Sequence, residues 1–380
     1  MATPVHTGQG RTDREILGRA EVNDVDTIID ISRANCDTTS VIHAVRDSSD
    51  ALFTWDYAKG ARPQLDRLYE KAKTSQWNAQ TDLDWSIEVD PYEAFSIFSE
   101  NGSESEFERD EDLPTANWGE DEWREFSLES FKWRMSQFLH GEQGALLCTA
   151  KIVETVPWID AKYYAATQVV DEARHVEVFG KYIDTKLGDS YPINAHLKLL
   201  LDDIISDSRW DMTYLGMQIM VEGLALAAFG FMHQLTPEPL LKKLLRYVMA
   251  DEARHVAFGV LSLKEYYAEL SLTELRERQE FAFEAAVRMR DRFIQQEVWE
   301  RMGVPVRPMV QNFLSLPPEQ KPFQNILFSK IVPNCKKLGL LDAGDAWLRR
   351  RFEDIHVIQF EDWVDTGEEY EEFQVEPVAV

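Results

Sequence analysis

The chain has 380 residues, 44% of them hydrophobic, so it can bury a sizeable core. Its 40 basic and 67 acidic residues give a formal net charge of −27, which opposes binding to nucleic acid and to anionic membranes. Three scattered cysteines argue against a disulfide framework, and no uninterrupted apolar run reaches the ~20 residues of a membrane span. Because the N-terminus is polar and lacks a signal-peptide core, we expect a cytoplasmic protein without a membrane or nucleic-acid partner.

The N-terminal segment, 1–120, is predicted to be a mostly helical extension. The stretches 22–48 and 62–77 have helical patterns, whereas the acidic stretch 100–114 is typical of a solvated loop. The last residues of the chain are also acidic and indicate an irregular tail.

Long stretches with helical apolar periodicity occupy the middle of the chain, and proline or glycine separates them. Ser271 and Glu274 have the spacing of a capping box, which predicts one more long helix that ends near Gly303. No stretch between 120 and 300 alternates with the two-residue period of a strand. The predicted fold is therefore all-α, with a helical bundle at 121–268 and C-terminal helices and the acidic tail at 269–380. The four long helices are expected at 126–156, 159–187, 208–234 and 238–268.

The hexapeptide DEARHV occurs twice, at 171–176 and 80 positions later at 251–256. Each copy contains Glu-x-x-His, in which the two side chains project from one face of a helix. Glu172 with His175, and Glu252 with His255, can therefore each bind a metal ion. The structural alternative for a single copy is a solvated charged face, but an identical pair favours a shared site.

Each hexapeptide is preceded, by 30 residues, by a glutamate in a largely apolar helix. Glu142 precedes Glu172, and Glu222 precedes Glu252. A lone carboxylate in such a helix is costly unless it is paired or bound to metal. Two antiparallel hairpins of this kind form a four-helix bundle in which one Glu from each of two helices meets two Glu-x-x-His pairs, the ligand set of ferritin-like dimetal proteins.

Four carboxylates and two imidazoles suit two divalent iron or manganese ions. No cysteine accompanies them, which disfavours structural zinc and iron–sulfur clusters. We therefore predict two iron ions, with a manganese–iron pair as the alternative. The predicted metal ligands are Glu142, Glu172, His175, Glu222, Glu252 and His255.

The stretch from GEQGALL to DEARHVEVF, 141–179, resembles the ferritin-like di-iron carboxylate superfamily on its oxygen-activating side. It is similar to the multicomponent monooxygenase hydroxylases and to ribonucleotide reductase small subunits. The resemblance covers 126–260 and implies a ferritin-like four-helix bundle, with additional flanking helices, that houses a dinuclear metal site. It also implies a set of supporting residues that orient the metal-binding histidines. These supporting residues are Asp171, Arg174, Asp251 and Arg254.

Three positions depart from those relatives. Phe179 stands where the reductase subunits carry their radical tyrosine, so a stable tyrosyl radical there is excluded. Leu226 stands where the monooxygenase hydroxylases carry a threonine, and Val248 stands where arylamine N-oxygenases carry an additional histidine ligand. The metal motifs are thus expected without the radical tyrosine or the active-site threonine.

The resemblance predicts a non-haem di-iron oxygenase or oxidase that uses O2 and an electron donor, such as a reductase or a ferredoxin. Its substrate would be a small, apolar or aromatic molecule, and a homodimer is compatible with the sequence. The alternatives are an iron-handling or peroxide-scavenging protein, an N-oxygenase of amines, and a protein in which the metals are only a structural cross-link. The predicted pocket residues are Phe138, Gly141, Ala145 and Leu226, for which plain helix packing is the alternative.

Overall fold

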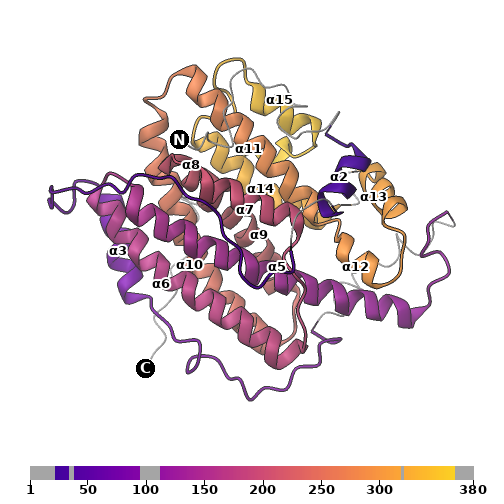
Figure 1. The fold of residues 1–380 in the computed structure, drawn as a ribbon. Coiled ribbons are helices and arrows are strands. Elements are labelled where there is room, and N and C mark those ends of the chain that lie inside the picture. The colour runs from indigo at the N-terminus through magenta and orange to yellow at the C-terminus, as the bar shows by residue number, and fades with distance from the viewer. Residues whose placement is uncertain (1–21, 34–37, 95–111, 318–320, 364–380) are drawn as a thin grey trace.

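The computed structural model describes residues 22–33, 38–94, 112–317 and 321–363. These residues form helices and contain no strand, so the predicted all-α fold class is confirmed (Figure 1). Most of the predicted acidic loop, the acidic tail and Cys36 lie outside the described residues.

Four long helical stretches form the bundle, as the apolar periodicity predicted. Helix α5 pairs with α6, and α10 packs against both α9 and α6. The third stretch is continuous from Trp210 to Leu235 but changes its winding, because a π-helical segment, η3, separates α8 from α9. The bounds are α5 (Glu120–Thr155), α6 (Ile159–Tyr182), α8 (Trp210–Tyr214), η3 (Leu215–Val221), α9 (Glu222–Leu235) and α10 (Pro239–Tyr267).

The ends of these helices follow from local sequence. Pro239 occupies the first turn of α10, where its missing N–H costs nothing. The Glu238 carboxylate accepts hydrogen bonds from the backbone N–H groups of Leu240 and Leu241. Helix α6 continues into a π-helical turn, η2 (Ile183–Leu187), which ends at Gly188 with φ 87°.

Flanking helices cover the bundle on several sides. Helix α3 lies against α6 and α10, whereas α11, α14 and α15 lie on another side (Figure 1). Helices α2, α12 and α13 group together at one end of the molecule. The bounds are α2 (Val25–Arg33), α3 (Pro63–Thr74), α7 (Ala195–Ser206), α11 (Leu272–Arg292), α12 (Gln296–Arg301), α13 (Val306–Ser315), α14 (Pro322–Lys337), α15 (Trp347–Asp354) and the 3-10 turn η5 (Ile358–Phe360).

Two predicted helices differ from the structure. Of the helix expected over 22–48, the described residues form α2. The stretch 38–57 forms no helix, because its large apolar side chains do not pack onto the bundle; Val41 is fully exposed. The helix expected to run from Ser271 to Gly303 begins with the predicted capping box but breaks before α12, where Gln295 has φ 56°. Helix α7 was not predicted from the sequence.

The described residues form two hydrophobic core clusters, and the smaller one joins α2, α12 and α13. The larger cluster of buried residues joins Leu65 of α3 and Phe131 of α5 to Phe281 of α11 and Phe328 of α14. The division at 120 and 268 into an N-terminal extension, a bundle and C-terminal helices stays a prediction.

The stretch Trp210–Leu235 is apolar and long enough to cross a membrane by length and composition. However, 83% of its most apolar window is buried inside the structure. The same stretch carries Glu222, so it serves as a core helix of the bundle.

Candidate metal centre

The structure brings the six predicted ligand side chains together inside the bundle. Each of the four bundle stretches contributes, with one glutamate on α5, another at the start of α9, and a Glu-x-x-His pair on each of α6 and α10. Their exposed fractions lie between 0% and 5%, so all six are buried. The six are Glu142, Glu172, His175, Glu222, Glu252 and His255.

The two imidazoles direct Nδ1 at the glutamates. His175 Nδ1 lies 3.2 Å from a Glu142 oxygen and 3.1 Å from a Glu252 oxygen. His255 Nδ1 lies 3.1 Å from a Glu172 oxygen and 3.5 Å from the other Glu252 oxygen. The ring centroids of the histidines are 5.9 Å apart. Glu252 therefore contacts both histidines, and Glu172 does the same because it also lies 3.6 Å from His175.

These contacts define two overlapping groups of candidate ligands. The first group is Glu142, Glu172, His175 and Glu252, and the second is Glu172, Glu222 and His255. Within each group, one ligand atom per residue lies within 4.8 Å of the others. A shared carboxylate between two three- to four-ligand groups is the arrangement needed to hold two neighbouring ions rather than one.

Several buried oxygen and nitrogen atoms of the cluster, although close to one another, make no hydrogen bond to a described residue. They include one oxygen of Glu172, one of Glu222 and both oxygens of Glu252, together with Nδ1 of His255. A buried carboxylate without a partner is unfavourable, and coordination to a divalent cation would satisfy these lone pairs. The donor set consists of oxygen and imidazole nitrogen, which iron and manganese accept.

Proximity and burial also shift the protonation of the cluster. Burial, followed by the negative charge of Glu252, raises the pKa of Glu142 to about 8. Burial and the charge of Glu172 raise the pKa of Glu222 well above its ordinary value. Burial lowers the pKa of His175, but the neighbouring carboxylates outweigh it, so the net pKa is raised. Without metal the cluster therefore retains protons, which cations would displace.

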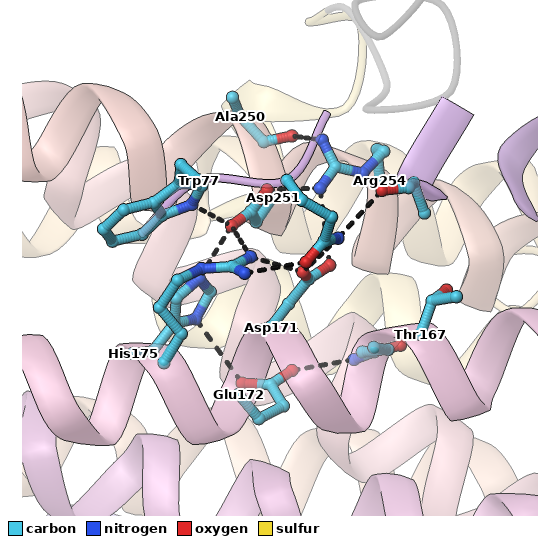
Figure 2. A network of polar contacts seen from close by, with 12 residues as sticks. Trp77, Thr167, Asp171, Glu172, His175, Ala250, Asp251 and Arg254 are labelled. Atoms are coloured by element: carbon cyan, nitrogen blue, oxygen red, sulfur yellow. Dashed lines mark hydrogen bonds and ion pairs between the residues drawn. The ribbon is translucent and has the colours of Figure 1, made fainter. Parts of the chain in front are cut away.

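Each supporting aspartate contacts the histidine of the other repeat. His175 donates from Nε2 to Asp251 of the other hexapeptide at 3.2 Å (Figure 2). In the same way, His255 Nε2 lies 3.4 Å from Asp171. Hydrogen bonding of Nε2 to a carboxylate leaves Nδ1 as the metal-binding atom. The predicted orienting role thus connects the two hairpins rather than acting within either.

Two arginines join these aspartates into a closed ion-pair network. Arg174 contacts Asp171 at 2.5 Å and Asp251 at 3.0 Å. Arg254 pairs with Asp251 and lies 3.3 Å from Asp171 (Figure 2). All four side chains are at most 8% exposed, so their charges are compensated by one another rather than by water.

The sequence analysis missed two residues that cover this network. Trp77 donates its indole N–H to Asp251 at 2.7 Å, and Gln76 donates to Asp171 at 3.1 Å while accepting from Arg174 at 2.8 Å. Both follow α3, which packs on α6 and α10. No motif or spacing in the N-terminal segment indicates this contact.

Gln168 is a further missed residue, and the sequence did contain a signal for it. Its side-chain amide donates to Glu172 at 2.9 Å and to Glu222 at 3.0 Å, and it is fully buried. Gln168 stands one helical turn before Glu172 and therefore on the same face. It stabilises Glu172 and Glu222, which both belong to the second ligand group.

A pocket opens beside the glutamates. Its cavity volume is about 20 Å³, and the empty space reaches about 320 Å³ only when open solvent at its mouth is included. Glu142, Glu222 and Glu252 lie in its wall, so it is continuous with the candidate metal centre. The other wall residues are Gln137, Phe138, Gly141, Ala145, Val221, Ala225 and Arg292.

Three of the four predicted pocket residues lie in this wall, and Leu226 does not. The reason is helical phase. At ~100° per residue, Ala145 lies ~60° to one side of Glu142, and Ala225 lies at the same offset from Glu222. Leu226 lies ~40° to the opposite side of Glu222 and is buried, with 6% exposure. Adding the repeat interval of 80 to Ala145 gives Ala225, so the repeat contained the correct position.

No protein-family model and no curated protein matches the chain. Among solved structures, an R2-like ligand-binding oxidase with an aerobically reconstituted Mn/Fe cofactor is similar, at 17% identity and TM-score 0.47, over 74% of this chain and 94% of that chain. The same oxidase after photoconversion gives 17% identity and TM-score 0.49 over the same fractions. A variant with an anaerobically reconstituted Mn/Fe cofactor gives 18% and 0.46, also over those fractions. At these low values, the site must be judged on its own geometry.

The bundle and the placement of its six side chains define the class. One Glu from each of two helices, with Glu-x-x-His from each of the other two, is the arrangement of ferritin-like dimetal carboxylate proteins. The helical arrangement expected from the DEARHV repeat is that of the structure, and metal binding by the six side chains stays a prediction.

Proposed function

We propose that the protein is an oxidoreductase that uses a dinuclear metal centre and O2 to oxidise a small organic substrate. The observation that carries the proposal is the joint placement of six buried ligand-type side chains and an open pocket in whose wall three of them stand. An iron store needs the ligands but has no use for a pocket beside them that is lined in part by apolar side chains.

The proposed ligands of one ion are Glu142 and His175, and those of the other are Glu222 and His255. Glu172 and Glu252 would bridge, because each contacts both histidines. When bound, two such ions supply the electrons and the coordination sites for O2 reduction. The proposed pair is Fe/Fe, with Mn/Fe as the alternative; the similar oxidases are described with Mn/Fe.

The residues around the centre would position the substrate and exclude water. Phe138 stands in the pocket wall, and its ring is held by Phe179 and Phe229, which are fully buried and do not line the pocket; the ring centroids are 4.7–6.2 Å apart. On the opposite side, the ion-pair network around Asp171 and Asp251 fixes both imidazoles. Turnover also needs an external electron donor, for which a reductase or a ferredoxin is proposed. A cytoplasmic location and a homodimer are proposed on the sequence alone.

Anaerobic metal loading followed by O2 exposure tests the function. We expect two ions per chain by elemental analysis, and O2 consumption with changes in the optical and Mössbauer spectra. Parallel loading with ferrous ion alone and with manganese plus ferrous ion identifies the pair. One ion per chain, or two ions that never react with O2, would contradict the proposal. O2 consumption that yields only ferric oxide, with no oxidised product from a panel of organic acids, amines and hydrocarbons, would favour iron handling.

A further inference from the structure

The pocket contains one cationic side chain that the metal chemistry does not use. Arg292, the last residue of α11, stands in the same wall as Glu142, Glu222 and Glu252. It is only 3% exposed. Its position derives from the packing of α11 against α7 and η3, which brings the end of this helix to the pocket.

Arg292 has no hydrogen bond or ion pair with any other described residue. Its guanidinium carbon lies 4.6 Å from the ring centroid of Phe293, and its buried Nε has no acceptor. By contrast, Arg288, one turn earlier on α11, pairs with Asp203 and Glu284. A buried guanidinium without a partner is unfavourable, so an anion in the pocket would stabilise it.

The charges of the loaded centre point in the same direction. Four glutamates contribute four negative charges, and two divalent ions would cancel them. The guanidinium of Arg292 then remains as an uncompensated positive charge beside the pocket. Burial lowers the pKa of Arg292 to about 9, so the side chain is still protonated near neutral pH.

We propose that Arg292 binds the carboxylate of the substrate, so that the substrate class is a small organic carboxylic acid with an apolar body. The planar guanidinium matches a carboxylate with two parallel hydrogen bonds. The apolar body would lie among Phe138, Ala145, Val221 and Ala225, next to the metal-binding glutamates. This inference rests on the proposed function, whose apolar or aromatic substrate it narrows to an acid.

Binding to the metal-loaded full chain tests this pairing without requiring turnover. Benzoate and hexanoate are compared by calorimetry with benzamide and hexanamide, which have the same shape and no charge. We expect each acid to bind wild-type protein about 10- to 100-fold more tightly than its amide, the range of a charge-assisted pair. Arg292→Gln should remove this preference, and Arg292→Lys should retain part of it because the charge remains.

Arg276→Gln is the matched control, because it makes the same charge change on α11 at a side chain that lies outside the pocket wall. It should leave the preference for acids unchanged. Acid binding that is undiminished in Arg292→Gln, equal binding of acids and amides, or binding of neither to the wild type would each overturn the inference. Circular dichroism and metal content are measured on every variant; if Arg292→Gln does not fold, the Arg292→Lys variant and the acid–amide comparison still decide.

Failure of the proposed function is visible separately. If the protein binds benzoate through Arg292 but does not consume O2, the inference about the carboxylate stands and the proposed oxidase function is wrong. If the protein consumes O2 and oxidises a neutral substrate with no preference for acids, the proposed oxidase function stands and the inference about the carboxylate is wrong.

Discussion

Asp171 and Asp251 show how much a single carboxylate can determine in this protein. Each aspartate accepts from the histidine of the opposite hexapeptide and pairs with both arginines. The histidine tautomer, the ring orientation and the charge balance of Arg174 and Arg254 therefore depend on two side chains that need not touch a metal ion. The resemblance implied that these residues support the site, but only the packed bundle shows that the pairing is crossed.

Asp251→Asn should weaken metal binding about 10- to 100-fold while leaving the helices intact. The amide can present an N–H to His175 in place of an acceptor, which disfavours the tautomer with a free Nδ1. Metal titration followed by elemental analysis measures the change. Trp77→Phe serves as the milder comparison, because it removes only one donor to Asp251. Unchanged metal affinity in Asp251→Asn would contradict the orienting role.

Glu222→Ala should reduce the loaded protein from two ions to about one. Glu222 belongs only to the second ligand group, so the first group keeps its complete set. Glu142→Ala should weaken the first group in the same way. The melting transition should survive in both variants, since apolar helix packing supplies most of the stability. Two ions retained in either variant would show that the carboxylate is not a ligand.

Leu226→Ala should act on stability rather than on the pocket. The side chain is 6% exposed and does not line the pocket, so its truncation should cost roughly 2–5 kcal/mol of the free energy of unfolding. Metal content and ligand binding should stay unchanged. Ala225→Leu is the opposite case, because it adds volume to the pocket wall and should block organic ligands while the metals still bind. A Leu226→Ala variant with normal stability and altered product profile would reverse this assignment.

At the scale of elements, the π-helical segment η3 sets the position of Glu222. It occupies the seven residues immediately before that glutamate, and its wider turn changes the helical phase between Tyr214 and α9. Helix α10 approaches η3 closely at Gly259, where an added Cβ would lie 2.6 Å from Cβ of Gln218. Gly180 in the first hairpin is not constrained in this way, because the nearest atom to an added Cβ, Leu139 Cδ1, lies 4.0 Å away.

Gly259→Ala should destabilise the protein by about 1–3 kcal/mol, because a rigid atom of η3 must move to admit the methyl group. The displacement should also weaken binding of the second metal ion, since Glu222 follows η3 directly. Gly180→Ala is the matched control: the closest atom to the new methyl is 4.0 Å away, and the helix should gain about 0.5–1 kcal/mol. Melting curves and metal content distinguish the two. Equal stability of both variants would show that η3 yields at no cost.

The sequence predicted these elements unevenly, and the reasons are physical. The bundle helices have long apolar faces, so their positions followed from periodicity and from the prolines and glycines that separate them. The same rule extended the helix at 22–48 beyond α2, where Val41 and Ile42 are exposed, and missed the break at Gln295, which has φ 56°. Ligands spaced along helices were predictable, whereas Gln76, Trp77 and Arg292 reach the site only through the fold.

At the scale of the whole molecule, low pH should stabilise the folded apoprotein, whereas metal binding should stabilise the protein more as pH rises. Glu142 has a pKa of about 8 in the folded apoprotein, above its unfolded value near 4.5. Its contribution to stability is therefore present at low pH and is lost as pH rises from 4.5 to 8. The raised pKa values of His175 and His255 also favour the apoprotein at lower pH. Metal ions need the deprotonated carboxylates and neutral imidazoles.

We therefore expect the increase in melting temperature caused by metal to grow as pH rises from about 5 to 8, with release of protons on binding. Calorimetric melting of apo and loaded protein in a pH series measures the difference. Glu222→Ala, which removes one titrating carboxylate, should reduce both the shift and the number of protons released. A metal-induced shift that is constant over this range would mean that the cluster is already deprotonated without metal.

The crossed aspartates have one more consequence, which concerns how the protein can be divided. A hairpin cut from this chain would keep its glutamate and its Glu-x-x-His pair yet lack the carboxylate that orients its own histidine. An isolated half should thus bind metal loosely, and two such halves expressed as separate chains should recover tight binding only when they assemble. Each histidine is therefore held in its orientation only when the two hairpins are assembled, and each half-unit depends on the other for its metal-binding geometry.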